Sequence, residues 1–278
     1  MTKLEYKLTH DTLFKMLFTK YQNLLERLVA VLLRIRPESI EQFVVTNTEI
    51  PPETKDDKFC RLDINMIVDG QRIGLEVQVD DEGDYTERSL YYWAREYSTA
   101  LVEGSSYNLL PKTIIISILR FNLFDCVKFH SEFRPLEVTR HTPLTDKMVL
   151  YYFELPKLPK DLVAEDELKL WLALFKAETE EDLAKIEALE VPIMQQAIEA
   201  YRHVKATDEF KELERLRSKA RHDEAQALYN ATKVEREKWQ GVVAEKDAAL
   251  TEKDAVLTEK EEEIEQLRAQ IAKLKENS

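Results

Sequence analysis

Residues 59–80 read FCRLDINMIVDGQRIGLEVQVD, and this stretch decides the fold. Two apolar-rich runs flank the dipeptide Asp69-Gly70, which is the strongest short signal for a β-hairpin with a two-residue turn. Such a turn sets the register of both strands, because Val68 must then pair with Gln71.

In this register Asp63 lies opposite Glu76, Arg61 lies opposite Gln78, and Asn65 shares their face. Successive side chains of a strand point to opposite faces, so the alternate positions form a second face that is entirely apolar. Its pairs are Leu62 with Val77, Ile64 with Leu75, and Met66 with Ile73. We expect the apolar face to belong to a core.

The polar face places two carboxylates directly across from each other, with Cβ atoms about 4.5–5.5 Å apart, where they repel. A shared proton, which raises one pKa, relieves the repulsion. A divalent cation between the acids also relieves it, and Mg²⁺ prefers such oxygens. A metal there polarises a phosphoryl oxygen and activates a water for phosphodiester hydrolysis. The alternative is that this face is the solvated side of an antiparallel hairpin.

The remaining elements follow from hydrophobic periodicity and from breakers. The pattern predicts helices and strands in the following ranges: a helix over 10–36, a strand or loop over 40–50, a helix over 85–103, a strand buried on both faces over 112–119, and a strand over 146–155. From residue 161 onward the sequence is helical and charged.

The last part of the chain carries apolar residues at sevenfold spacing. These are Val243, Leu250, Leu257, Ile264 and Ile271. The second core position of the heptad holds lysines as far as Lys260. The stripe predicts a weak or short coiled coil, and hence a homo-oligomer joined through the C-terminal helix. The alternative is a single charged helix stabilised by Glu–Lys pairs.

Composition sets limits on the function. The 278 residues carry a net charge of −13, which argues against simple electrostatic coating of nucleic acid. Residues 161–190 hold 10 acids and 3 bases, and residues 244–278 hold 10 acids and 6 bases, so the rest of the chain is near neutral. Cys60 and Cys126 form no CxxC motif, and we expect small core residues of a reducing compartment.

The sequence also argues against a membrane span, a signal peptide, a zinc site and a nucleotide-binding loop. No stretch approaches the about 20 apolar residues of a membrane span, and no signal peptide opens the chain, so we expect a cytoplasmic protein without membrane contact. The five histidines lack the spacing of zinc ligands. With 5 glycines and no P-loop, the chain has no nucleotide cradle.

The spacing D-x12-E-x-Q at Asp63, Glu76 and Gln78 resembles the PD-(D/E)xK nuclease superfamily, and the chain is most similar to its Rpn family of recombination-promoting nucleases and transposases. Three segments carry the resemblance: HDTLFKMLF at 10–18, RLDINMIVDGQRIGLEVQV at 61–79, and the segment at 85–124 that begins YTERSLYYWAREY. The match spans about residues 9–155 and continues more weakly through the helical region.

The resemblance implies an α/β fold with a restriction-endonuclease-like mixed sheet flanked by helices, followed by a helical region and a long C-terminal helix. We expect a nuclease-like domain over 1–160, a helical region over 161–238 and a charged helix over 239–278. The implied activity is DNA endonuclease cleavage dependent on Mg²⁺ or Mn²⁺, with DNA as partner.

Carried over by position, Asp63 and Glu76 are metal ligands and catalytic residues. Gln78 stands where the superfamily usually has lysine. The Rpn-like group is similar to this chain in carrying glutamine at that position. A neutral amide orients water or donates a hydrogen bond but supplies no positive charge to the transition state. A catalytically weak or inactive DNA-binding or assembly protein that oligomerises through its C-terminal helix is therefore the alternative function.

Three further residues are candidates for the site. Asp11 approaches from the first helix as a catalytic acid, or it is an acid favoured by the helix dipole. Lys15, one turn later, contacts phosphate or pairs with Asp11. Arg88 contacts the DNA backbone, as Arg95 on the same helix face also would, or both are solvated surface residues.

Overall fold

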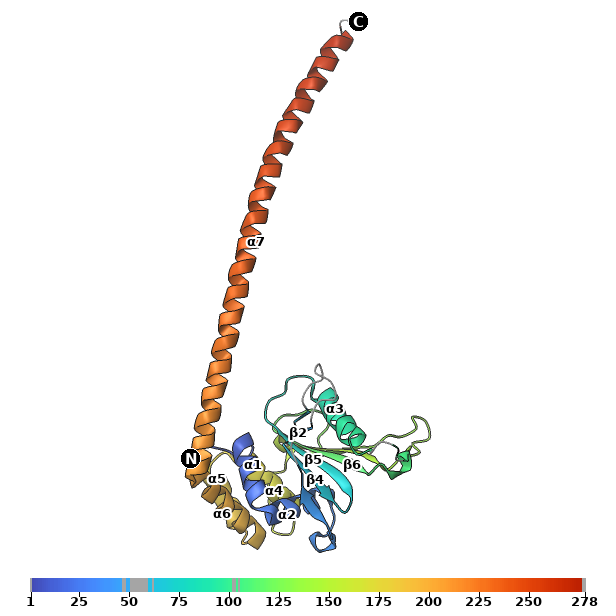
Figure 1. Ribbon diagram of the computed structural model, residues 1–278, viewed down its shortest axis with the longest axis vertical. Coiled ribbons are helices and arrows are strands. Elements are labelled where there is room, and N and C mark those ends of the chain that lie inside the picture. Colours follow the sequence, from blue (N-terminus) through green and yellow to red (C-terminus); the bar gives the residue numbers. More distant parts are fainter. Residues whose placement is uncertain are drawn as a thin grey trace. The chain divides into compact units, whose positions relative to one another are not determined.

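The computed structural model describes residues 2–46, 49–50, 60–61, 63–101, 104 and 106–276. Its centre is a six-stranded mixed sheet in the order β1-β4-β5-β6-β8-β7 (Figure 1). β5, β6 and β8 run parallel, whereas β1, β4 and β7 are antiparallel to their neighbours. The strands are β1 (Phe43–Val45), β4 (Ile64–Val68), β5 (Gln71–Gln78), β6 (Thr113–Leu119), β7 (His130–Phe133) and β8 (Met148–Glu154).

The β4–β5 hairpin confirms the predicted register, because Val68 pairs with Gln71 and every later pair follows from it. Asp69 and Gly70 both have positive φ, at 47° and 74°. Left-handed backbone at both turn positions matches the twist of the flanking strands, which is why Asp-Gly favours this hairpin.

The strand before the hairpin is shorter than predicted, since β4 begins at Ile64. Cys60–Arg61 forms the separate β3, which pairs with β2 (Glu49–Ile50) in a two-stranded sheet. The predicted pairing of Arg61 with Gln78 is therefore wrong, because Arg61 pairs with Glu49. Leu62, predicted opposite Val77, lies outside the described residues.

Helices cover both faces of the sheet, which confirms the predicted architecture (Figure 1). On the apolar hairpin face, Ile64, Met66, Ile73 and Leu75 are at most 1% exposed and join the main core, and Val77 is partly buried against it. The helices that contribute to this core are α1 (Asp11–Lys20), α2 (Gln22–Leu33), α4 (Glu167–Lys176), α5 (Glu180–Glu187) and α6 (Pro192–Ala206). A second core forms where α3 (Tyr85–Ser98) packs on β6 and β8, and includes Tyr85, Ile115 and Tyr152.

Three local predictions need correction. The single helix over 10–36 is two helices, because the backbone breaks at Tyr21 (φ −114°, ψ 70°). The edge strand β7 was not predicted, since its four residues HSEF carry little apolar pattern. Cys126 is exposed with a free thiol rather than a core residue. Single turns of 3-10 helix lie at Pro37–Ser39, Tyr107–Leu109 and Leu155–Lys157.

The chain divides into two compact units, Met1–Glu214 and Arg215–Ser278. The boundary expected near residue 160 lies inside the first unit, because α4 places Trp171 and Phe175 in its main core. The helix α7 (Asp208–Glu276) begins in the first unit, with Phe210 fully buried, and makes up most of the second.

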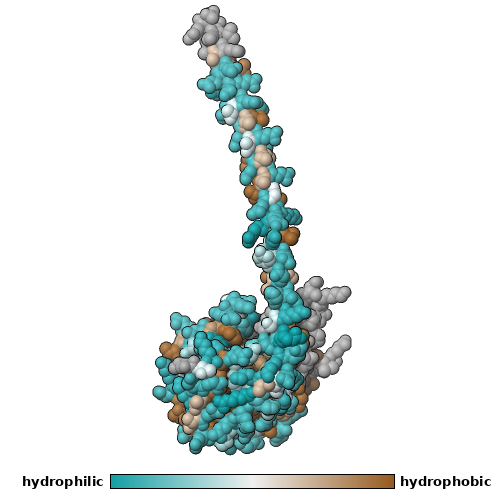
Figure 2. Space-filling view, turned by 90° about the vertical axis from the view of Figure 1, so that its left-hand side faces the viewer, coloured by the Kyte–Doolittle hydropathy of each residue, from teal (hydrophilic) through white to brown (hydrophobic). Residues whose placement is uncertain are grey.

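In the second unit apolar side chains recur along α7 among hydrophilic ones (Figure 2). The heptad positions from Val243 to Ile271 are 49–58% exposed. None of the described helices combines the length and apolar character needed to cross a membrane.

Candidate active site

The open end of the β4–β5 hairpin carries the two predicted acids. The backbone N–H of Asp63 donates to Glu76 Oε1 (2.9 Å), and the backbone N–H of Val77 donates to Asp63 Oδ2 (2.8 Å). These bonds continue the hairpin beyond its last strand pair, with carboxylate oxygens as acceptors in place of backbone carbonyls. The ends of the two strands therefore hold both carboxylates side by side.

Lys15 reaches this pair from α1. Its Nζ lies 3.2 Å from Asp63 Oδ1 and 2.6 Å from Oδ1 of Asp11, which is one turn earlier on the same helix. The side chain of Asp63 is 15% exposed and that of Asp11 is 48% exposed, so Asp11 lies at the rim and Asp63 inside. Both predicted α1 residues thus join the site, where two carboxylates contact one ammonium and Glu76 lies beside Asp63.

The pKa values record an excess of buried negative charge. Burial raises the pKa of Glu76 well above its ordinary value, and the adjacent charge of Asp63 raises it further. Burial also raises the pKa of Asp63, against the opposing charge of Lys15 and the Val77 N–H. Burial disfavours the charged form of Lys15, but the charges of Asp63 and Asp11 outweigh it and raise its pKa. The two inner carboxylates therefore favour a proton or a cation.

The polar face of the hairpin is covered rather than solvated. Asn65 is 3% exposed and Glu76 is 5% exposed. The hydroxyl of Tyr85, at the start of α3, donates to Ser117 Oγ (2.9 Å), and Ser117 is the β6 residue in register with Glu76. Burial and the charge of Glu76 raise the pKa of Tyr85 well above its ordinary value. The solvated-face alternative is wrong, because α3 covers this side of the sheet.

Gln78 and Arg88 lie at the margin of the site. Gln78 shares the face of Glu76 on β5, and its amide Nε2 donates to the carbonyl of Asp80 (2.9 Å). Arg88 pairs with Glu82 (3.2 Å) and lies over the ring of Tyr85, 4.9 Å from its centroid. Its charge is close enough to oppose the raised pKa of Glu76.

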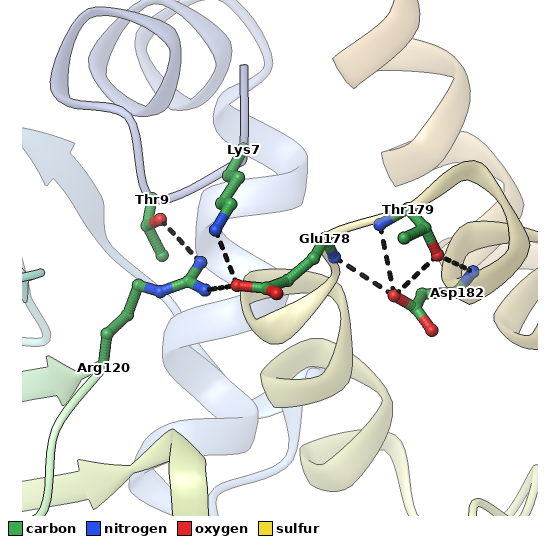
Figure 3. A network of polar contacts seen from close by, with 6 residues as sticks. All are labelled: Lys7, Thr9, Arg120, Glu178, Thr179 and Asp182. Atoms are coloured by element: carbon green, nitrogen blue, oxygen red, sulfur yellow. Dashed lines mark hydrogen bonds and ion pairs between the residues drawn. The ribbon is translucent and has the colours of Figure 1, made fainter. Parts of the chain in front are cut away.

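A polar network secures the segment before α1 against the carboxyl-terminal edge of the sheet (Figure 3). Arg120, directly after β6, donates to Thr9 Oγ1 (3.3 Å) and pairs with Glu178. Lys7 pairs with the same carboxylate at 2.6 Å. The backbone N–H of Arg120 donates to the carbonyl of Gln78 (2.9 Å). The network therefore links the start of α1 to the end of β5, where the acids lie.

A cavity of about 580 Å³ lies beyond this network, and Arg120 and Glu178 form part of its wall. Its other lining comes from the segment after β8 and from α4 and α5, including Lys160, Lys176 and Ile186. Its lining includes none of the carboxylate-site residues, which are Asp11, Lys15, Asp63 and Glu76. The chemistry at the hairpin is thus separate from this cavity.

The donor set suits a hard divalent cation held partly by water. Within the part of the chain that the structure describes, no group of three or more His, Cys, Asp or Glu side chains is arranged to hold a metal. Asp63 and Glu76 provide a partly buried and a buried carboxylate side by side, and burial disfavours the charged form of both. Mg²⁺ is commonly bound through one or two carboxylates, keeping several waters and contacting substrate phosphate. The residues present therefore fit such a cation.

Two residues of the site neighbourhood escaped the sequence analysis. Ser117 interrupts the apolar residues that follow Thr113 in the strand TIIISIL, and that isolated polarity is its signal. Arg120 follows the same run directly. Neither signal is specific, because only the parallel pairing of β6 with β5 places both residues beside the acids.

Most of the chain matches one protein family. A family model described as PD-(D/E)XK nuclease family transposase matches residues 8–231, which is more than half of the chain. No curated protein and no solved structure matches the chain. The matched range begins just before α1 and includes every residue of the carboxylate site.

Proposed function

The chain belongs to the PD-(D/E)XK nuclease family transposases, and on that premise we propose that it is a Mg²⁺-dependent DNA endonuclease acting at Asp63 and Glu76. Both carboxylates would hold the cation, with Mn²⁺ as a substitute. When bound, the cation would neutralise the pair, polarise a phosphoryl oxygen and lower the pKa of a water. Asp11 adds a third carboxylate at the rim, and Gln78 offers an amide beside Glu76.

The observation that carries the proposal is the pair of backbone hydrogen bonds, from Asp63 to Glu76 and from Val77 to Asp63, that holds the two carboxylates side by side. Like charges at adjacent buried positions cost stability, and a fold retains them where the site performs chemistry. The hydrogen bonds from the backbone hold the acids in place before any ligand arrives, as an active site requires. Arg88 at the margin offers a contact to the DNA backbone.

Cleavage of supercoiled plasmid with Mg²⁺ or Mn²⁺ tests the proposal. Asp63→Asn and Glu76→Gln preserve size and are expected to lower the rate at least about 100-fold, since each removes a carboxylate charge that would hold the cation. Glu87→Gln on exposed α3 surface is the matched control and retains activity. Wild-type rates in both hairpin variants would remove the site from the reaction.

The alternative function is a nuclease-fold protein that binds DNA and assembles without efficient cutting. The amide of Gln78 favours it, because this amide carries no positive charge and donates to the Asp80 carbonyl. DNA binding without cleavage in either metal supports this reading over the endonuclease.

Self-association through α7 is part of the same proposal. The apolar heptad positions are about half exposed in the single chain, and a second copy would bury them as coiled-coil knobs. Light scattering on a chain that ends at residue 238 is expected to show a smaller oligomer than the full-length protein. An unchanged oligomer number refutes the role of α7.

A further inference from the structure

We infer that Lys15 of α1 supplies the catalytic positive charge of this site. The motif position that would normally supply it holds Gln78, whose amide carries no charge. The inference rests on the proposed endonuclease function. It adds a residue from a different element to the reaction and assigns it direct contact with the scissile phosphate.

The chemistry defines what the cation must do. In hydrolysis the oxygen of water joins phosphorus while a phosphorus–oxygen bond to the sugar breaks. One proton of the water goes to the leaving sugar oxygen, and the other stays with the new phosphate monoester. Negative charge increases on the phosphate oxygens in the transition state, and a preorganised cation stabilises it best where water is excluded.

The geometry places the Lys15 ammonium at the acids. Its contacts of 3.2 Å to Asp63 and 2.6 Å to Asp11 use two of the three N–H groups. Among the described residues these two carboxylates are the ion-pair partners of Lys15, so the third N–H remains for a phosphate oxygen. The side chain is 21% exposed, which keeps the ammonium in reach of a substrate at the rim.

The helix that carries Lys15 is held rigidly. Phe14 and Phe18 on α1 are fully buried and pack against each other and against Phe175 of α4. Thr12 donates to Glu214 (3.1 Å). A lysine on an anchored helix loses little additional entropy when it contacts a substrate, because its aliphatic stem is already ordered.

Arg88 is the competing cation. Its guanidinium pairs with Glu82, whose side chain is 66% exposed, and lies over Tyr85. The charges of Arg88 and Lys15 both oppose the raised pKa of Glu76, whereas the direct contact to Asp63 belongs to Lys15. The position of Arg88 at the margin favours a contact to the DNA backbone that positions the substrate.

Relocating the charge tests the inference. Lys15→Gln is expected to lower single-turnover cleavage with Mg²⁺ at least about 100-fold. Lys15→Arg retains part of the rate. The double variant Lys15→Gln with Gln78→Lys recovers at least about 10-fold over the single variant, because it returns a cation to the same carboxylates. Lys20→Gln, at the exposed end of α1, is the matched control and cuts as wild type.

Two measurements separate catalysis from structure. Thermal unfolding with and without Mg²⁺ shows whether Lys15→Gln remains folded and keeps the shift caused by the metal. Fluorescence anisotropy with labelled duplex DNA, without divalent metal, is expected to show less than about a tenfold loss of affinity, since one phosphate contact is removed. A rate loss much larger than the affinity loss places Lys15 in the transition state.

The outcomes are distinct. If the wild type cuts and Lys15→Gln cuts equally, the inference fails while the proposed function stands. A loss that neither Lys15→Arg nor the relocated lysine recovers, in a folded protein, assigns Lys15 to positioning Asp63 and overturns the inference. A large loss in Arg88→Gln with Lys15→Gln unaffected gives the role to Arg88. No cleavage by the wild type in either metal removes the proposed function and this inference together.

Discussion

Glu154 and Glu76 are both buried acids near the carboxyl-terminal ends of strands in one sheet, yet their surroundings differ. Glu154, at the end of β8, is fully buried, and its Oε1 lies 2.6 Å from Nζ of Lys157. The backbone N–H groups of Leu123 and Phe124 donate to the same oxygen, at 2.6 and 3.1 Å. One cation and two donors therefore balance the charge of this carboxylate through Oε1, although Oε2 is buried without a hydrogen-bond partner among the described residues.

Glu76 has no such balance. It shares its neighbourhood with Asp63, and the ammonium of Lys15 is divided between Asp63 and Asp11. Arg88, the further cation nearby, pairs with Glu82. The comparison teaches that this fold can neutralise a buried acid one for one, so the excess at the hairpin is a property of the site rather than of the sheet. Perturbed acids of this kind concentrate at functional sites.

The largest expected effect on stability belongs to the balanced acid. Glu154→Gln leaves the Lys157 ammonium, which is 10% exposed, without its counter-charge. We expect a loss of about 3–5 kcal/mol in the free energy of unfolding, because breaking a buried pair leaves one charge uncompensated. Urea unfolding followed by circular dichroism measures it. A change below about 0.5 kcal/mol, the scale of ordinary surface substitutions, would mean that Lys157 and Glu154 do not balance each other as a buried ion pair.

At the hairpin, replacing the buried acid is expected to increase the free energy of unfolding rather than decrease it. The pKa of Glu76 is raised in the folded protein above the ordinary value of 4.5. The folded state therefore binds more protons than the unfolded state between these two pKa values, and stability falls as pH rises through that window. Glu76→Gln keeps the acceptor for the Asp63 N–H and removes the charge, so it is expected to raise the free energy of unfolding at pH 8.

The pH dependence provides the check on this second prediction. The advantage of Glu76→Gln over the wild type is expected to shrink as pH falls toward 4.5, where the folded wild type holds the proton and the unfolded chain is half protonated. Melting temperatures at pH 8 and at pH 4.5 give both values. A destabilised Glu76→Gln at pH 8 would mean that the nearby cations already balance the hairpin.

The smallest expected effect comes from added metal. Mg²⁺ at ten times its dissociation constant is expected to stabilise the wild type by about 1.4 kcal/mol, since it binds the folded state alone. Differential scanning calorimetry of wild type, Asp63→Asn and Glu154→Asp measures the shift. The hairpin variant loses it, and the β8 variant retains it. An equal shift in Asp63→Asn would place the cation elsewhere.

Much of the hairpin follows from local chemistry alone. Asp69 and Gly70 adopt the left-handed backbone that a two-residue turn demands, and a fixed turn allows one register. That register brings Asp63 next to Glu76 without information from any other part of the chain. The buried run of β6 and the helical pattern of α3 are local for the same reason, because each is a periodicity within one segment.

The helix break at Tyr21 and the edge strand β7 show the limit of such patterns. Both helices around Tyr21 bury their apolar side chains in the same core, so the periodicity continues where the backbone does not. β7 exists because the neighbouring β8 offers it an edge, and its own residues carry little apolar pattern.

What the sequence alone determined is the pair of acids, since a turn of two residues sets the positions of both strands that carry them. Only the tertiary structure decided which groups surround that pair. They are the ammonium of Lys15, the carboxylate of Asp11, and the α3 side chains that cover Glu76. These groups come from elements whose positions depend on the packing of α1 and α3 against opposite faces of the sheet. Periodicity predicts which side of a helix is buried, but only the packed core determines what its remaining side chains meet.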